Sequence, residues 1–361
     1  MLRTTTSAIA LLSLLSLPAL ADESFKPSIS GEVAIEVQND HNYKSDDADA
    51  EQNELFTLTE TTVVLEALPG LKVVAHGVLE PVEDPEARED RVFEDHGLFM
   101  EELFLEYAHE TNFGGLGLKA GKFNVDFGRG WDATPGVYGT EFAEDGYEIT
   151  ERVGFEGAID LKTEHYGAHR MTLATFFADT SGLSSSTIQD RPIVKKADGG
   201  ASNTEDFSSY ALGLGGDVPG VMSLTYHLGF ISQAGGDGST ADETGYAAAL
   251  MYEIPVTEDL SINPFVEAVQ QNSTGAVDGT DTTHLTGAVE ATWKGWNTAV
   301  AYTDRTTETS GAPDTDDHQF QVSAGYEFEN GLGLNVGWKQ REESGIQSET
   351  VGALATYTIA Y

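Results

Sequence analysis

Apolar and polar residues alternate with a period of two along most of this chain, and helical periodicity is hard to find over any useful length. One such segment places two sets of residues on opposite faces of an extended chain: Leu332, Leu334, Val336 and Trp338 against Gly333, Asn335, Gly337, Lys339 and Arg341. After the amino-terminal segment, no stretch approaches the roughly 18 consecutive apolar residues of a transmembrane helix. The pattern therefore predicts an all-β fold.

The alternating segments give about sixteen candidate strands, most of them near the roughly 9–11 residues that a tilted membrane strand requires. They span residues 29–39, 54–67, 71–82, 98–110, 115–126, 151–162, 168–179, 207–217, 221–233, 242–254, 260–271, 282–293, 296–307, 317–329, 332–342 and 349–361.

The connections between these segments alternate in length. The odd-numbered connections are mostly long and polar, whereas the even-numbered ones are short turns that include Pro-Gly and Asn-Gly pairs, which are good turn formers. One rim of a cylinder would then carry large loops and the other rim tight turns. A sandwich or a solenoid has no reason for this asymmetry. The alternation of long and short connections therefore predicts a transmembrane antiparallel β-barrel with long extracellular loops and short periplasmic turns.

The amino terminus has the three parts of a secretory signal peptide. Arg3 supplies a positive start, an apolar stretch follows at 8–17, and Ala19 and Ala21 form a small-residue cleavage site. We therefore expect a signal peptide at 1–21 and a barrel at 22–361, with an uncleaved membrane anchor as the alternative.

Composition excludes several classes of function. The chain has no cysteine, so it has no disulfide framework, thiolate metal site or cysteine nucleophile. Without the leader it has 18 basic and 60 acidic residues, a formal net charge of −42, which argues against a nucleic-acid partner. The acidity fits cation attraction, divalent ions bridging to lipid phosphate, or a salty habitat. No nucleophile-elbow or His-Glu-x-x-His motif occurs, so an enzyme is disfavoured and no metal or cofactor is predicted.

Two segments resemble a known family. The last strand alternates up to Tyr361 and resembles the carboxy-terminal assembly signal of Gram-negative outer-membrane proteins, although phenylalanine is commoner at that end. Gly121-Lys122-Phe123 and Phe127-Gly128 resemble the strand that leads into the third loop of Gram-negative porins. The resemblance implies a homotrimer in the Gram-negative outer membrane, in contact with lipid and lipopolysaccharide, which admits small hydrophilic solutes or ions by passive diffusion.

In that family the third loop folds into the barrel and narrows the pore, so the resemblance makes loop 127–150 the expected constriction. Its acidic residues would face a basic wall across the constriction and order water in a transverse field. The acids are Asp132, Glu141, Glu144 and Asp145, and the wall residues, all on expected inward faces, are Arg152, Arg170, Arg305, Lys339 and Arg341. For any single one of these acids and bases, the simpler interpretation is an ordinary solvated charge.

The acidity of the chain favours cations as the preferred solutes. The alternatives are a porin selective for anions or sugars, a barrel enzyme such as a lipase or protease, and a secreted β-rich adhesin.

Overall fold

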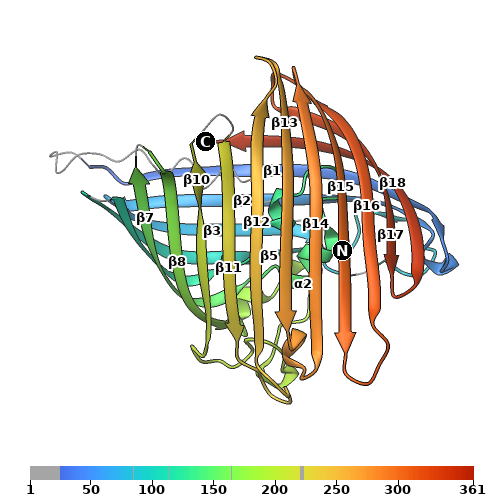
Figure 1. Cartoon of the computed structure of the whole chain (residues 1–361), viewed down its shortest axis with the longest axis horizontal. Coiled ribbons are helices and arrows are strands. Elements are labelled where there is room, and N and C mark those ends of the chain that lie inside the picture. The colour runs from blue at the N-terminus through green and yellow to red at the C-terminus, as the bar shows by residue number, and fades with distance from the viewer. Residues whose placement is uncertain (1–24, 84, 113, 164, 220–222) are drawn as a thin grey trace.

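The computed structural model describes residues 25–83, 85–112, 114–163, 165–219 and 223–361, so the expected signal peptide, 1–21, lies outside the described residues. Within these ranges, sixteen long strands form one closed antiparallel barrel (Figure 1). The strands are β1 (Ser28–Ser45), β2 (Gln52–Leu68), β3 (Leu71–Pro81), β5 (His96–Thr111), β6 (Gly114–Phe123), β7 (Arg152–Thr163), β8 (Gly167–Ala178), β10 (Ser209–Val218), β11 (Ser223–Gln233), β12 (Glu243–Pro255), β13 (Leu260–Asn272), β14 (Thr280–Trp293), β15 (Trp296–Thr309), β16 (Thr315–Glu327), β17 (Leu332–Glu343) and β18 (Ile346–Ala360).

The barrel confirms the predicted fold class and the predicted strand number. Each strand pairs with its neighbours in the sequence, and β1 closes the ring by pairing with β18, from Glu32 opposite Ala360 to Ser45 opposite Ser348. In the described part of the chain, no helix is long and apolar enough to cross a membrane.

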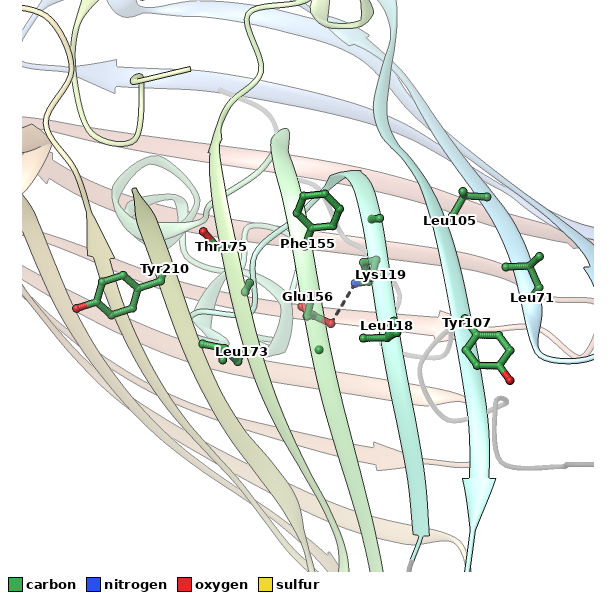
Figure 2. A pocket seen from close by; sticks show the side chains of 13 residues that line it. Leu71, Leu105, Tyr107, Leu118, Lys119, Phe155, Glu156, Leu173, Thr175 and Tyr210 are labelled. Atoms are coloured by element: carbon green, nitrogen blue, oxygen red, sulfur yellow. Dashed lines mark ion pairs between the residues drawn. The ribbon is translucent and has the colours of Figure 1, made fainter. Parts of the chain in front are cut away.

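The wall is apolar outside and polar inside. Along β14, for example, Leu285 is 53% exposed on the outer face, whereas its neighbour Thr286 is 1% exposed and points inward. Figure 2 shows an outer hollow over β5 to β8, lined by Leu118, Phe155 and Leu173, with the inner ion pair between Lys119 and Glu156 behind it. This division fits a barrel that turns its apolar face to lipid.

The first and last long connections are shorter than we expected. We predicted loops at 40–53 and 343–348, but β1 continues to Ser45 and β18 begins at Ile346. Both strands continue because residues 40–45 still pair with 348–352 after the apolar alternation has ended. The connection between β17 and β18 is therefore the two-residue turn Ser344-Gly345.

Shorter elements lie in the loops. They are β4 (Arg91–Val92), β9 (Thr187–Ile188), α1 (Gly130–Ala133), α2 (Glu141–Tyr147) and the one-turn helices Ala48–Ala50, Gly182–Ser184, Lys196–Asp198 and Thr274–Ala276. The pairing of β5 with β6 stops at Leu103 opposite Lys122, and β9 pairs with Gly97 and Leu98 beyond that point. The loop that carries β9 therefore contributes a strand to the wall where β6 has ended.

The carboxyl terminus is part of the closure. The amide of Tyr361 donates to the carbonyl of Gly31 at 3.0 Å, and the amide of Gly31 donates back to Tyr361 at 3.0 Å. A Cβ at position 31 would lie 2.5 Å from the Tyr361 hydroxyl and 2.5 Å from the Thr62 carbonyl. Glycine is therefore required for this close approach of β1, β2 and the last residue.

This contact gives a test of closure. We expect Gly31→Ala to lower the urea midpoint of the folded barrel, because overpacking of this kind costs about 1–3 kcal/mol. Gly287→Ala is the matched control, since a Cβ at that strand position meets nothing within 4 Å. Unfolding in detergent, followed by heat-modifiable gel migration, measures both variants. Equal midpoints for the two variants would contradict the closure geometry.

Candidate functional site

The third long loop, residues 124–151, lies inside the barrel, and Figure 1 shows α2 within the ring of strands. It leaves the wall after β6, contains α1 and α2, and rejoins the wall at β7. Five of its large apolar side chains are almost fully buried: Phe127, Val137, Tyr138, Phe142 and Tyr147. Burial of one such side chain stabilises the folded loop by about 1.5–3 kcal/mol, which explains why a loop of this length is compact.

The beginning of the loop is bound to the wall by Asp126. Its carboxylate accepts from Arg129 at 2.9 Å and from Thr172 of β8 at 3.1 Å, and contacts His227 of β11 at 3.0 Å. Burial would raise the pKa of Asp126, but His227 and Arg129 outweigh burial and hold the pKa well below its usual range. Asp126 is therefore ionised at neutral pH and ties the loop to two strands.

Glu267 of β13 joins both helices of the loop. Its carboxylate accepts from the amides of Arg129 at 2.5 Å and Gly130 at 2.6 Å, and from the Tyr147 hydroxyl at 2.5 Å. The side chain is 1% exposed. A Cβ at Gly130 would lie 2.6 Å from the Glu267 carboxylate, so glycine allows the backbone to approach it. One buried carboxylate thus satisfies two amides at the start of α1 and the end residue of α2.

Two glutamines of β16 hold the middle of the loop, and both are 1% exposed. Gln321 donates to the carbonyls of Gly139 at 2.7 Å and Pro135 at 3.0 Å, and accepts from the Tyr138 amide at 3.1 Å. Gln319 donates to Gly139 at 3.2 Å. An amide side chain has both donors and an acceptor, so it can satisfy a bent backbone that a carboxylate could not.

Helix α2 rests on the basic residues of β15 and β17. Glu141 contacts Lys339 and accepts from Arg341 at 3.1 Å, and Arg341 also lies 3.5 Å from Asp145. Burial would raise the pKa of Glu141, but Lys339 and Arg341 outweigh burial and hold the pKa at about 2. Glu141 is therefore ionised at neutral pH. Of the expected site residues, these four meet in one cluster.

Arg305 joins this cluster through Phe142. The guanidinium of Arg305 lies 4.3 Å from the centre of the Phe142 ring, and that of Arg341 lies 4.7 Å from it. Arg305 also pairs with Asp317 at 2.6 Å and with Glu343 at 2.7 Å. The three wall bases thus contact the loop directly and already have acidic partners.

The other expected residues lie elsewhere. Arg170 pairs with Asp160 on the neighbouring strand at 3.2 Å, and Arg152 donates to the Thr150 carbonyl at 2.5 Å at the end of the loop. Glu144 lies half-buried on α2. Asp132 lies on α1, where burial, opposed by Arg129, raises its pKa to about 6.

The root of the loop carries a second ion-pair network. Lys122, at the end of β6, pairs with Glu151 at 2.7 Å and with Asp179 at 3.0 Å, and Arg191 pairs with Glu151 at 2.6 Å. These contacts join the two ends of the third loop to the loop that carries β9. The described residues contain no group of three or more histidine, aspartate or glutamate side chains arranged to hold a metal.

Sequence reasoning missed Glu267, Gln319 and Gln321 as loop contacts. The alternation placed all three on inward faces, but inward polar residues are numerous in this barrel. The paired glutamines on one strand face were the available signal, because amides suit irregular backbone better than solvated charges do.

The Glu267 contacts give the second test. We expect Glu267→Gln to speed hydrogen exchange of the Arg129 and Gly130 amides by roughly tenfold or more, because an unpaired buried donor costs about 1–3 kcal/mol. Glu290→Gln is the matched control, since Glu290 bonds Asn263 on the neighbouring strand. Exchange measured by mass spectrometry on the folded protein decides the outcome. Unchanged exchange in Glu267→Gln would show that this carboxylate does not hold the loop.

Comparison with known proteins agrees with this architecture. The outer-membrane channel DcaP of Acinetobacter baumannii is 13% identical, with a TM-score of 0.55 over 92% of this chain and 97% of that chain. OpdK of Pseudomonas aeruginosa, solved with vanillate, is 10% identical, with a TM-score of 0.54 over 92% and 99%. An anion-selective porin from Comamonas acidovorans is 11% identical, with a TM-score of 0.53 over 92% and 99%. At these identities the likeness shows the fold alone.

Among curated proteins, the search gave no significant match. A family model described as Gram-negative porin matches residues 5–361, which is nearly the whole chain. The chain therefore belongs to the Gram-negative porin family and is a channel of the outer membrane rather than an enzyme.

Proposed function

We propose that this channel is water-filled, admits small hydrophilic solutes by passive diffusion, prefers cations, and is narrowed by loop 127–150. The observation that best supports the proposal is the position of the loop inside the barrel, where it contacts β13, β16 and β17. A loop that is bound to the wall at several separate points stays in place. It therefore narrows the lumen constantly rather than intermittently. A barrel of this size otherwise leaves an aqueous channel.

The cation preference rests on the balance of charges. Lys339, Arg341 and Arg305 each have an acidic partner, so they contribute little net positive charge to the lumen. The whole chain carries 60 acidic against 19 basic residues. Unbalanced acidic charge along a water-filled passage with low-dielectric walls raises the local concentration of cations.

A substrate-selective channel is the second candidate. One solved neighbour is described as anion-selective and another was solved with vanillate. In this chain the cluster of Lys339, Arg341 and Arg305 could attract an anion only if the solute displaced Glu141 or Asp317 from it.

We also propose a homotrimer in contact with outer-membrane lipid and lipopolysaccharide, as the family resemblance implies.

Planar-bilayer recording on the detergent-folded protein tests the proposal. In a potassium chloride gradient we expect discrete conductance steps and a reversal potential of the sign that potassium permeation produces, because the acidic excess attracts cations. Boiled protein serves as the control for insertion artefacts. A reversal potential of the opposite sign would overturn the cation preference and favour the substrate-selective alternative.

A further inference from the structure

The carboxyl end of α2 lies against β13 and β14, near the ends of these strands that the loop 273–279 connects (Figure 1). The ring of Tyr147 meets the ring of His284 edge to face, with 5.0 Å between the ring centres. A Cβ at Gly146 would lie 2.6 Å from the same imidazole, so glycine is needed for this approach. The position of α2 therefore depends on a part of the wall that carries an outer loop.

Gln271, near the end of β13, joins this end of α2 to a buried acid. The side-chain nitrogen of Gln271 donates to the carbonyl of Gly146 at 3.1 Å and to the carboxylate of Glu243 at 3.2 Å. An amide nitrogen carries two hydrogens, so both bonds can form at once. Gln271 and Glu243 are 2% and 3% exposed, so neither bond is easily replaced by a bond to bulk water.

Glu243, the first residue of β12, extends this contact to the loop 273–279. Its carboxylate also accepts from the side-chain amide of Gln233 at 2.9 Å and from the backbone amide of Gly275 at 2.7 Å. Hydrogen bonds to a carboxylate are strong, and three donors share this one. If the Gly275 donor is lost, the carboxylate is incompletely paired and must adjust, and Gln271 adjusts with it. We call Gln271 and Glu243 the Glu243 link.

The loop 273–279 is itself bound to the neighbouring loop, 234–242. The amide of Thr240 donates to the carbonyl of Ala276 at 3.1 Å, and the amide of Asp278 donates to the Thr240 hydroxyl at 2.8 Å. Ala276 is fully buried between these contacts. The two loops therefore form one unit, which we call the outer-loop pair.

Contacts rather than backbone preference hold the loop 273–279 in its shape. Ser273, Gly275 and Ala276 have φ values of 53°, 67° and 64°. This left-handed region is unfavourable for residues that have a Cβ, and such conformations persist only when the surrounding structure holds them. We therefore expect the loop to change its conformation when one of its contacts is lost.

We propose that the outer-loop pair sets the position of the carboxyl end of α2 through the Glu243 link, and thereby the width of the passage. The inference rests on the proposed function, because it requires that loop 127–150 narrows the channel. A molecule that binds the outer-loop pair and draws Gly275 away from Glu243 would release Gly146 and loosen α2. Gln271 and Glu243 are positioning residues, since they act on the passage only through the third loop.

Hydrogen exchange measured by mass spectrometry on the folded protein tests this coupling. Gly275→Pro removes the backbone donor to Glu243 in the outer loop rather than in α2. The Glu148 amide donates to the Ala143 carbonyl at the end of α2, and we expect its exchange to speed up by roughly fivefold or more. Glu243→Gln, which keeps the shape of the side chain and removes its charge, should act in the same direction.

Gly311→Pro is the matched control. Gly311 lies in the loop between β15 and β16, has a φ of 83°, and, like Gly275, has open space where a Cβ would be. It lies outside the Glu243 link, so exchange at the end of α2 should stay as in the unaltered protein. Equal acceleration in the two proline variants would overturn the inference, because it would show general loosening of the rim. Unchanged exchange in Gly275→Pro would also overturn it.

A double variant tests the route of the coupling. Gln271→Leu removes the bond to Gly146, so adding Gly275→Pro to it should cause no further acceleration of exchange in α2. Additive effects would show that the coupling does not pass through Gln271, and the inference would be wrong. Heat-modifiable migration confirms that each variant is folded, and Gln271→Met takes the place of a leucine variant that does not fold.

Bilayer recording of the same proteins separates this inference from the proposed function. We expect larger fluctuations of the open-channel current in Gly275→Pro than in Gly311→Pro, because a loosened α2 changes the width of the passage. Faster exchange with an unchanged current would overturn the inference and leave the pore proposal standing. Faster exchange in a protein that never conducts would support the link between the loops and overturn the pore proposal.

Discussion

Closure of the barrel is the constraint on which the rest of the structure depends. Inside hydrocarbon no water can replace a missing backbone partner, so every strand must be paired on both sides. The pairing of β1 with β18 completes this requirement, down to the two hydrogen bonds between Gly31 and Tyr361. Closure also fixes the register of every strand. The inner face therefore presents Glu267, Gln321 and Lys339 at fixed positions, to which the third loop binds.

Most of the fold could be predicted because each strand of a membrane barrel has lipid-facing apolar residues that alternate with inward polar residues. The segment expected at 282–293, for example, is β14, Thr280–Trp293. The full lengths of β1 and β18 could not be predicted. The two strands lie at opposite ends of the sequence, and their ends pair with each other beyond the residues in which apolar and polar side chains alternate. The two residues of β9 pair with Gly97 and Leu98, and nothing local in the sequence indicates that contact.

The site was predictable in its residue types more than in its contacts. The loop and the inward bases followed from the resemblance and from alternation, yet we expected acids and bases to face each other across a gap. Glu141 instead contacts Lys339 and Arg341 directly, so this side of the loop is electrically balanced. Which inward side chains become neighbours depends on register. Glu60 meets Glu36 and Glu80 only because three strands align there.

The third loop is bound to the inner wall at several points, and a disulfide across one of these contacts tests that directly. A Cβ at Gly337 of β17 would lie 2.8 Å from the Cβ of Val137, so the two backbones must move apart by about 1 Å to reach the roughly 3.5–4.5 Å that separates the Cβ atoms of a disulfide. The chain has no cysteine of its own, so any bond formed is unambiguous. Mass spectrometry on the double variant Val137→Cys with Gly337→Cys should show a spontaneous disulfide in the folded protein. Two free thiols in a folded barrel would show that the loop does not lie against β17.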